Sequence, residues 1–470
     1  MYPPFFLLPL GFIIFPYFVI LLSRNIKEKY FKFLFYGFAF GFGFLIIYLS
    51  WLPNPFLVNT NTSPYAIISI LLPIFLSIFF GLVFLIFKYV KHLIFIIFIT
   101  PFIFIFNEFI ISNIFYGFPW VSNSLILSNN FLGFYVIKYF GTLPSGFIIL
   151  SLFLFPVFII YKNIIIFSRK ILLIVFVPFM LLLIIPIYFT FNNNDKSSKE
   201  ITVDIHQILS PIYLKDQKKI EDNIIQHIKN SESEYIIFAE NNFPYLIEKN
   251  NLKNKFNFIK NEKKIIIGAT THKDSNYYNS FLLIEDGQVH FFDKKILVPF
   301  GEFLPFRKNL KFMEYISGST DFKIGKEDRL LITRDNLKIL PIICYEIIFE
   351  KIFKNINKKK IDILINITND SWFGDKIGPY QHFYISRTKS LIANKPLIRV
   401  SNNGISAIFD NNGKIIEASK LNKISNIKYN LKINNKKSYF YFHQIVSCYL
   451  LFIFILILVV SKKKQNEKFL

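Results

Sequence analysis

Three segments of this chain end in side chains that together could carry out acyl transfer. The thiol of Cys344 follows the apolar run 337–343, and the carboxylate of Glu240 follows four apolar or aromatic residues. The ammonium group of Lys294 ends a third extended run. Burial raises the pKa of a carboxyl group toward the range in which it accepts a thiol proton, and a nearby cation favours a thiolate and stabilises an oxyanion. The three groups supply the nucleophile, base and cation for chemistry through a thioester.

Each of these residues also has an ordinary structural explanation. A glutamate at a strand end is more often a surface residue than a base, and Lys294 has a second lysine beside it. A lone Cys344 could equally be an inert buried thiol. Only the combination of the three favours catalysis.

The elements that must position these residues alternate between short β-rich runs and more polar helical stretches. Strands are predicted at 201–205, 235–238, 264–269, 337–343 and 361–367, and an amphipathic helix at 215–231. Two hairpins are predicted, one turning at Asp286-Gly287 and one at Asn412-Gly413. Strands that end in polar loops and alternate with helices indicate an α/β sandwich with its chemistry at the strand ends.

The remainder of the chain has the composition of a membrane protein. Crossing a bilayer takes about 20 apolar residues, and seven stretches approach this length: 4–22, 32–50, 65–87, 93–111, 139–161, 171–190 and 444–461. We therefore predict a polytopic α-helical membrane bundle at 1–190 with six spans. An extramembrane domain follows at 191–443, and a last span with a short basic cytoplasmic tail at 444–470.

The basic residues of the loops predict the orientation. They follow alternate spans, at Arg24, Lys27, Lys29 and Lys32, then Lys88, Lys91 and His92, then Lys162, Arg169 and Lys170, and finally Lys462, Lys463 and Lys464. Short basic loops stay in the cytoplasm, so the domain at 191–443 is expected to face outward. The formal charge of +23 is spread along the chain, so no nucleic-acid partner is predicted.

Cofactor and disulfide chemistry are not indicated. One of the two cysteines, Cys448, lies in the last predicted span, so the cysteines form no disulfide framework. The seven histidines are dispersed without paired ligand spacing, and no phosphate-binding glycine loop is present. We expect neither a metal nor a cofactor.

The order and spacing of Glu240, Lys294 and Cys344 resemble the Glu-Lys-Cys triad of the nitrilase superfamily. Longer sequence motifs around them resemble those of the apolipoprotein N-acyltransferases. These motifs are Gly117-Phe118-Pro119-Trp120, Leu297-Val298-Pro299-Phe300-Gly301-Glu302, Ile343-Cys344-Tyr345-Glu346, Asn369-Asp370-Ser371-Trp372-Phe373-Gly374, Gln381-His382, and Arg399 with Ser401-Asn402-Asn403-Gly404. The resemblance covers nearly the whole chain.

The resemblance implies a nitrilase-like αββα sandwich on the periplasmic side of a bacterial inner membrane. It implies a ping-pong reaction in which Cys344 takes an acyl chain from a phospholipid and passes it to the α-amino group of a diacylglyceryl apolipoprotein. Glu240 would be the general base and Lys294 the oxyanion partner. Glu302 would orient both of them. The protein would act as a monomer without a cofactor.

The resemblance also suggests residues around this centre. Tyr345 and Glu346 would shape the pocket beside the thiol. The apolar segment 303–320 is interpreted as a mobile arm that rests on the membrane, with a packed surface loop as the alternative. The other candidates for substrate or lid contacts are Trp120, Trp372, Phe373, Gly374, His382 and Asn402. For Trp372-Phe373-Gly374 a packed turn is an equal alternative, and His382 is expected to be structural or pocket-lining.

The chain also departs from the family pattern. The family has eight spans, so we expect that the first helix is missing or that it precedes the assigned start. Ala239 stands where the family has proline before the base, here Glu240. Of the family's Gln-Gly-Asn motif, only Gln207 is present.

Two other functions remain open. In a membrane-tethered nitrilase-like amidase, water would replace the lipoprotein amine, although one span would be enough to anchor it. A transporter with a degenerate nitrilase domain would need charge inside the membrane, for which Glu108 and Lys138 are the main candidates. Labelling of Cys344 by an acyl probe would distinguish these readings.

Overall fold

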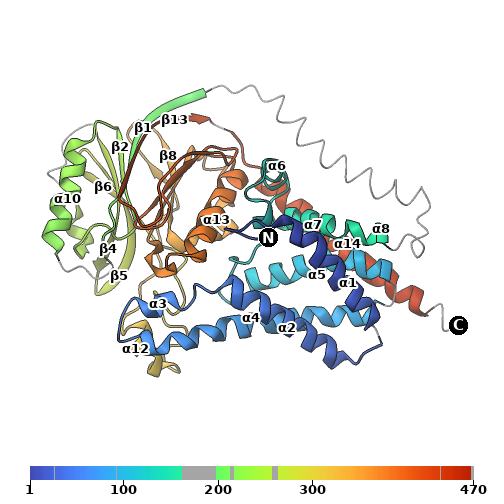
Figure 1. Ribbon diagram of the computed structural model, residues 1–470. Coiled ribbons are helices and arrows are strands. Elements are labelled where there is room, and N and C mark those ends of the chain that lie inside the picture. The colour runs from blue at the N-terminus through green and yellow to red at the C-terminus, as the bar shows by residue number, and fades with distance from the viewer. Residues whose placement is uncertain are drawn as a thin grey trace. The chain divides into compact units, whose positions relative to one another are not determined.

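The computed structural model describes residues 1–25, 27–90, 93–160, 197–211, 216–256, 263–434 and 436–466. The chain forms two compact units, and Figure 1 labels their elements. A helical unit contains Met1–Ser50, Ile68–Asn194 and Tyr439–Leu470, and an α/β unit contains Trp51–Ile67 and Asp195–Ser438. The short segment 51–67, which lies in sequence between two apolar helices, thus belongs to the α/β unit.

The helical unit is built from apolar helices around α5. Its helices are α1 (Gly11–Arg24), α2 (Tyr30–Tyr48), α4 (Leu71–Phe84), α5 (Leu93–Asn113), α6 (Phe131–Phe140), α7 (Thr142–Phe153), α8 (Phe155–Ile160) and α14 (Phe440–Asn466). Helix α5 contacts α1, α4, α7 and α14. Helices α2 and α4 approach closely because α2 presents Gly37 and Gly41, where a Cβ would lie 2.4 Å from the carbonyl oxygen of Phe80 or 2.7 Å from its side chain.

Four helices of the described residues are long and apolar enough to cross a membrane: Tyr30–Tyr48, Ser63–Tyr89, Phe95–Asn113 and Phe440–Val459. They coincide with four of the predicted spans. The spans predicted at 4–22 and 139–161 correspond to shorter apolar helices, Leu8–Arg24 and Thr142–Val157. The span predicted at 171–190 lies outside the described residues, so the count of seven stays a prediction.

The α/β unit contains two sheets that pack against each other through β1 and β10 and through β5 and β8. The first sheet has the order β13-β1-β2-β4-β5-β6, with β3 beside β4, and the second has the order β12-β11-β10-β9-β8-β7. The strands are β1 (Ser197–Gln207), β2 (Tyr235–Phe238), β3 (Ile247–Glu248), β4 (Lys264–Lys273), β5 (Asn276–Glu285), β6 (Gln288–Asp293), β7 (Leu331–Ile332), β8 (Lys338–Ile343), β9 (Ile363–Thr368), β10 (Leu397–Ser401), β11 (Ala407–Phe409), β12 (Ile415–Ala418) and β13 (Ser425–Asn434).

Helices cover the outer faces of the two sheets. Helix α10 (Gln217–Asn230) packs on the first sheet and α13 (Ile377–Ala393) on the second, as Figure 1 shows. The short helices of the unit are α3 (Asn54–Leu57), α11 (Leu252–Lys255) and α12 (Glu314–Ser317). The layers run helix, sheet, sheet, helix, which confirms the predicted αββα sandwich. Both predicted hairpins are present, as β5–β6 and β11–β12.

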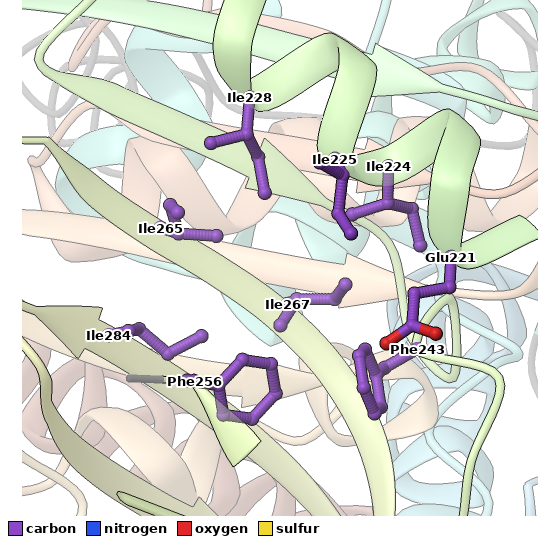
Figure 2. Close-up of a pocket in the computed structure, with 9 residues that line it drawn as sticks. All are labelled: Glu221, Ile224, Ile225, Ile228, Phe243, Phe256, Ile265, Ile267 and Ile284. Atoms are coloured by element: carbon purple, nitrogen blue, oxygen red, sulfur yellow. The ribbon is translucent and has the colours of Figure 1, made fainter. Parts of the chain in front are cut away.

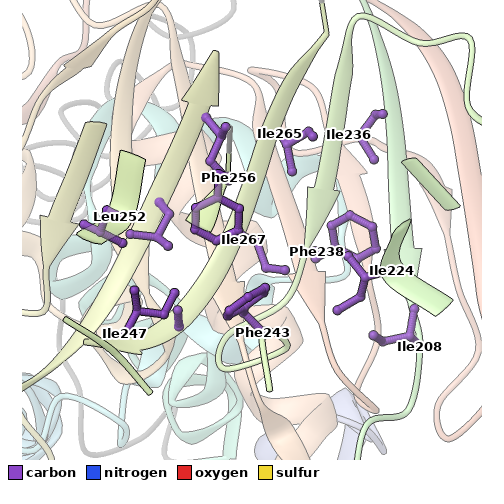
Figure 3. Close-up of a cluster of buried hydrophobic side chains, with 13 residues drawn as sticks. Ile208, Ile224, Ile236, Phe238, Phe243, Ile247, Leu252, Phe256, Ile265 and Ile267 are labelled. Atoms are coloured by element: carbon purple, nitrogen blue, oxygen red, sulfur yellow. The ribbon is translucent and has the colours of Figure 1, made fainter. Parts of the chain in front are cut away.

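The core under α10 follows from the spacing of its isoleucines. Ile220, Ile224 and Ile228 recur every four residues, so they share one face of the helix, and that face packs on a buried cluster that includes Phe238 and Ile267 (Figure 3). A small apolar pocket remains between the helix and the sheet (Figure 2). Burying a side chain of this size contributes roughly 1.5–3 kcal/mol, so this face of α10 fixes the helix on the sheet.

Candidate active site

The ends of three strands bring Glu240, Lys294 and Cys344 together. Cys344 follows β8 directly, Lys294 follows β6 directly, and Glu240 lies two residues after β2. The Lys294 Nζ atom is 3.5 Å from a carboxylate oxygen of Glu240, and that carboxyl group hydrogen-bonds the Cys344 thiol. The three side chains have at most 5% of their surface exposed. Segments separated by about fifty residues in sequence thus form one buried cluster.

Two further residues make polar contacts within this cluster. Glu302 accepts a hydrogen bond from Lys294 Nζ at 2.8 Å and another from the backbone N–H of Val298 at 2.8 Å. The amide nitrogen of Asn279 donates to Glu240 at 2.8 Å and to Glu302 at 3.0 Å. One amide therefore orients both carboxylates around the ammonium group.

Cys344 has an unusual backbone. Its φ is +48°, in the left-handed region that residues with a side chain seldom adopt. This conformation turns the chain sharply from β8 into the 3-10 helix Cys344–Ile348. A reactive side chain on such a turn is lifted out of the strand, and the surrounding structure must hold it there.

Glu346 links the loop that carries Lys294 to the loop that carries Cys344. Its carboxylate accepts hydrogen bonds from the backbone N–H groups of Lys295 at 2.8 Å, Ile296 at 3.1 Å and Ile343 at 3.0 Å. Both of its oxygens also pair with the guanidinium group of Arg329, at 2.8 and 2.6 Å. These contacts use the whole carboxylate, so Glu346 fixes the relative position of the two loops. Tyr345 is buried beside it, with its ring 5.2 Å from that of Phe349.

The electrostatics of the cluster favour a charged lysine and a neutral thiol. Burial raises the pKa of Cys344, and the Glu240 charge raises it further, against the opposing effect of Lys294. Burial also raises the pKa of Glu240, although Lys294 counteracts it. For Lys294 burial lowers the pKa, but Glu302 and Glu240 outweigh it and hold the pKa well above its usual value. A thiol of this kind needs a base to become a nucleophile, and the adjoining carboxylate can serve as one.

The segment 369–374 lies near the thiol but is only partly exposed. Trp372 has 37% of its surface exposed, whereas Phe373 is buried with its ring 4.9 Å from that of Trp51. Gly374 has a φ of +74°, and a Cβ there would collide with the side chain of Asn54. Trp372 is thus the most accessible of these residues to a substrate.

The other predicted substrate residues are buried. His382 is completely buried and pairs with Asp370. Asn402 binds the backbone of Ser210 through both its oxygen and its nitrogen, at 2.8 and 2.7 Å, so its amide holds a loop in place. Trp120 is fully buried in the helical unit.

Three residues of the cluster escape the sequence analysis. Asn279 and Arg329 act through contacts that only the fold creates, although each leaves a signal: a polar residue inside a strand and an arginine next to a short apolar run. Gly268 on β4 is the third. A Cβ at this position would lie 2.6 Å from Cα of Glu240 and 2.6 Å from the N atom of Asn241. The glycine therefore lets the Glu240 loop lie against β4.

Comparison with known proteins finds two matching families. Residues 228–429 match the carbon-nitrogen hydrolase family, and residues 1–155 match the apolipoprotein N-acyltransferase N-terminal domain. The chain thus combines a region similar to the carbon-nitrogen hydrolases with a region similar to the N-terminal domain of the apolipoprotein N-acyltransferases.

Individual relatives carry the same description. An apolipoprotein N-acyltransferase of Rickettsia typhi is 37% identical over 231 residues, covering 45% of this chain and 45% of its own. One of Wigglesworthia glossinidia brevipalpis is 35% identical over 262 residues, covering 52% of each chain. In each alignment the matched region spans about half the length of the relative. A crystal structure of a carbon-nitrogen hydrolase from Helicobacter pylori G27 aligns with 14% identity and a TM-score of 0.38, over 54% of this chain and 94% of its own.

Proposed function

We propose that this protein transfers an acyl chain from a phospholipid to the α-amino group of the diacylglyceryl-cysteine that begins an apolipoprotein. The observation that carries the proposal is the buried contact set of Glu240, Lys294 and Cys344, in a chain that also has helices able to cross a membrane. The similarity of both parts of the chain to apolipoprotein N-acyltransferases supports the choice of substrates.

The first half-reaction forms a thioester. Glu240 takes the proton of the Cys344 thiol, and the sulfur attacks the carbonyl carbon of the phospholipid ester. Lys294 stabilises the oxyanion of the tetrahedral intermediate. The bond from that carbon to the glycerol oxygen then breaks, and Glu240 returns the proton to the departing lysophospholipid. Because the carboxylate can accept and return one proton, its raised pKa suits both steps.

The second half-reaction forms an amide. The neutral α-amine of the lipoprotein attacks the thioester carbon, and Lys294 again faces the oxyanion. Glu240 takes a proton from the amine, and the carbon–sulfur bond breaks. The proton then returns to the Cys344 sulfur. The thiol is regenerated, and no cofactor is consumed in this ping-pong scheme.

The segment 303–320 supports access from a lipid surface. Phe306, Phe312 and Tyr315 have 70%, 77% and 63% of their surface exposed. An ion pair of Arg307 with Glu314 at 2.9 Å braces the base of the segment. Exposed aromatic residues in such number mark an interaction surface, and we propose that this arm rests on the bilayer and gates lipid entry.

We further propose that the protein is a monomer in a bacterial inner membrane with its α/β unit in the periplasm. The basic loops that alternate along the chain support this orientation. A transporter function is less well supported. Glu108 accepts hydrogen bonds from the side chain of Ser122 and from the backbone and amide of Asn123, all within 2.9 Å, so its charge is tied to a fixed loop.

An acceptor experiment tests the proposal. The protein in detergent is mixed with a phospholipid that carries one labelled acyl chain and with a diacylglyceryl-cysteine peptide. A matched peptide with an acetylated α-amine is the control. The proposal predicts label in an amide on the free peptide only. Release of the label as free fatty acid at the same rate with either peptide would contradict it, and hydrolysis of small amides would favour the amidase.

A further inference from the structure

Cys344 touches a second group of polar side chains that takes no part in the proton transfers above. The group consists of Thr368 at the end of β9, Asp370 in the turn that follows, His382 in α13 and Arg399 in β10. All four side chains are completely buried. Buried polar groups are costly unless they are fully paired, so such a cluster beside a nucleophile calls for an explanation.

Asp370 is the centre of this group. One of its oxygens lies 2.9 Å from His382 Nδ1, and the other lies 2.5 Å from a guanidinium nitrogen of Arg399. The hydroxyl group of Thr368 donates to Asp370 at 3.1 Å. Burial alone would raise the pKa of Asp370, but Arg399 and His382 outweigh it and hold the pKa far below its usual value. The carboxylate is therefore charged and orients the imidazole.

Arg399 fixes this group to the frame of the α/β unit. Its guanidinium donates to the side chain of Asn366 on β9 at 2.9 Å, to the hydroxyl of Ser386 on α13 at 3.1 Å and to the backbone carbonyl of Ile405 at 3.2 Å. Gly404 leaves the space for the pair, because a Cβ there would lie 2.1 Å from the Asp370 carboxylate. The network thus joins two strands and a helix.

Two contacts connect the network to Cys344. Helix α13, which carries His382, packs against the 3-10 helix that begins at Cys344, and the hydroxyl of Thr368 hydrogen-bonds the Cys344 thiol. The Cys344 backbone has a φ of +48°, a conformation that persists only when neighbours hold it. The neighbours of this residue include α13, which carries His382, and the hydroxyl of Thr368.

The segment that begins at Trp51 supports the same group from outside. The indole N–H of Trp51 donates to the side chain of Gln381 at 3.0 Å, and its ring meets that of Phe373 edge to face. Phe373 in turn packs on the imidazole of His382, with 5.2 Å between ring centroids. The amide of Asn54 holds the carbonyl of Phe373 at 2.9 Å.

We propose that Asp370, His382 and Arg399 are positioning residues that hold the Cys344 backbone in its left-handed conformation, with the thiol toward Glu240, and that Trp51 braces them through Phe373. This inference rests on the proposed thiol chemistry. It assigns no proton transfer to the histidine.

Two substitutions of His382 separate its contacts. In His382→Asn, the amide nitrogen replaces Nδ1 and keeps the donor toward Asp370, but the outer part of the ring is lost. In His382→Gln, the longer side chain fills the position of Nε2. His290→Asn, at an exposed histidine on β6, is the matched control. All variants carry Cys448→Ala, so that Cys344 is the only thiol in the chain.

The test measures two rates on folded protein in detergent: acylation of Cys344 by phospholipid, and its alkylation by iodoacetamide between pH 6 and pH 10. We expect His382→Asn to slow acylation roughly 10- to 100-fold, as for a misplacement of about 1 Å. Its alkylation should shift to lower pH, because the thiol moves away from the Glu240 charge, which raises the pKa of the thiol. His382→Gln should recover most of both rates, and Trp51→Ala should shift alkylation in the same direction by less.

The outcomes are distinct. Acylation and alkylation profiles of His382→Asn equal to those of His290→Asn would overturn the proposal, as would a lower melting temperature with both profiles unchanged. An unchanged profile in Trp51→Ala would overturn the bracing role alone. If phospholipid fails to acylate even the wild type, the proposed function fails, while the alkylation profiles still decide the positioning role.

Discussion

Removing the charge of Glu302 should change how the rate of Cys344 acylation depends on pH. Glu302→Gln preserves the shape of the side chain and leaves an amide oxygen to accept from Lys294. Lys294 then keeps Glu240 as its only charged partner within ion-pair distance among the described residues. Glu240 also loses the like charge that raises its pKa. Both pKa values should therefore fall.

The distances give the size of the effect. At an effective dielectric constant of about 20, unit charges at 2.8 and 3.5 Å attract by roughly 6 and 5 kcal/mol. Burying an ammonium group costs several kcal/mol, so one carboxylate barely offsets that cost and two exceed it. One pKa unit corresponds to about 1.4 kcal/mol. Loss of the Glu302 charge, partly replaced by the amide dipole, should lower the pKa of Lys294 by about two to four units.

The assay is the rate of Cys344 acylation by phospholipid as a function of pH. In the wild type, the raised pKa of Lys294 keeps the cation throughout the alkaline range. In Glu302→Gln, Lys294 loses its proton at a lower pH than in the wild type. The alkaline decrease in the acylation rate should therefore begin at a lower pH. The neutral-pH rate should drop roughly 10- to 100-fold, the value of one hydrogen bond to a charged group.

The control is Glu221→Gln, the same change in a carboxylate on α10 that pairs with Lys255 at 3.1 Å. Its profile should match the wild type. An alkaline limb in Glu302→Gln at the wild-type position would refute the reasoning, because Lys294 would then not depend on Glu302 for its charge.

Three further substitutions have expected outcomes. Gly268→Ala places a Cβ 2.6 Å from the Glu240 backbone and should slow acylation at least roughly tenfold, whereas Gly43→Ala, which meets nothing within 4 Å, should leave it unchanged; equal rates would contradict the role of Gly268. Arg329→Met leaves Glu346 buried without its cation, and thermal unfolding should show a loss of roughly 3–5 kcal/mol. Arg329 holds the pKa of Glu346 below its usual value, against burial, so the wild type loses this stabilisation as the pH falls, and the variant should instead gain stability toward low pH. Ile224→Ala opens the core under α10 and should cost about 2–5 kcal/mol of unfolding free energy without changing the alkylation rate of Cys344, and a changed rate would couple α10 to the site.

Much of the fold and the central residues could be predicted from sequence. Glu240, Lys294 and Cys344 each follow an extended run, and such runs form strands whose polar ends can carry the chemistry. The hairpins at Asp286 and Asn412 were predictable because their turn residues are specific. The proximity of the three groups follows from the resemblance to the family and not from local signals, because β2 and β6 lie in one sheet and β8 lies in the other.

The supporting contacts could not be predicted in the same way. Asn279 and Arg329 act only because the two sheets pack together, and no local pattern encodes that packing. Gly268 looks like any glycine in a strand until the loop that lies against it is known. Glu346 was expected to shape a pocket, but its contacts with three backbone N–H groups and Arg329 depend on the path of the loop after β6.

The most direct test of the account is intact-protein mass spectrometry after incubation with phospholipid alone, in wild type and Cys344→Ala. The account predicts that the wild type gains the mass of one acyl chain, that hydroxylamine removes it, and that the variant gains nothing. A folded wild type that gains no mass, or an adduct of equal size on Cys344→Ala, would contradict the thioester at the centre of the proposed reaction.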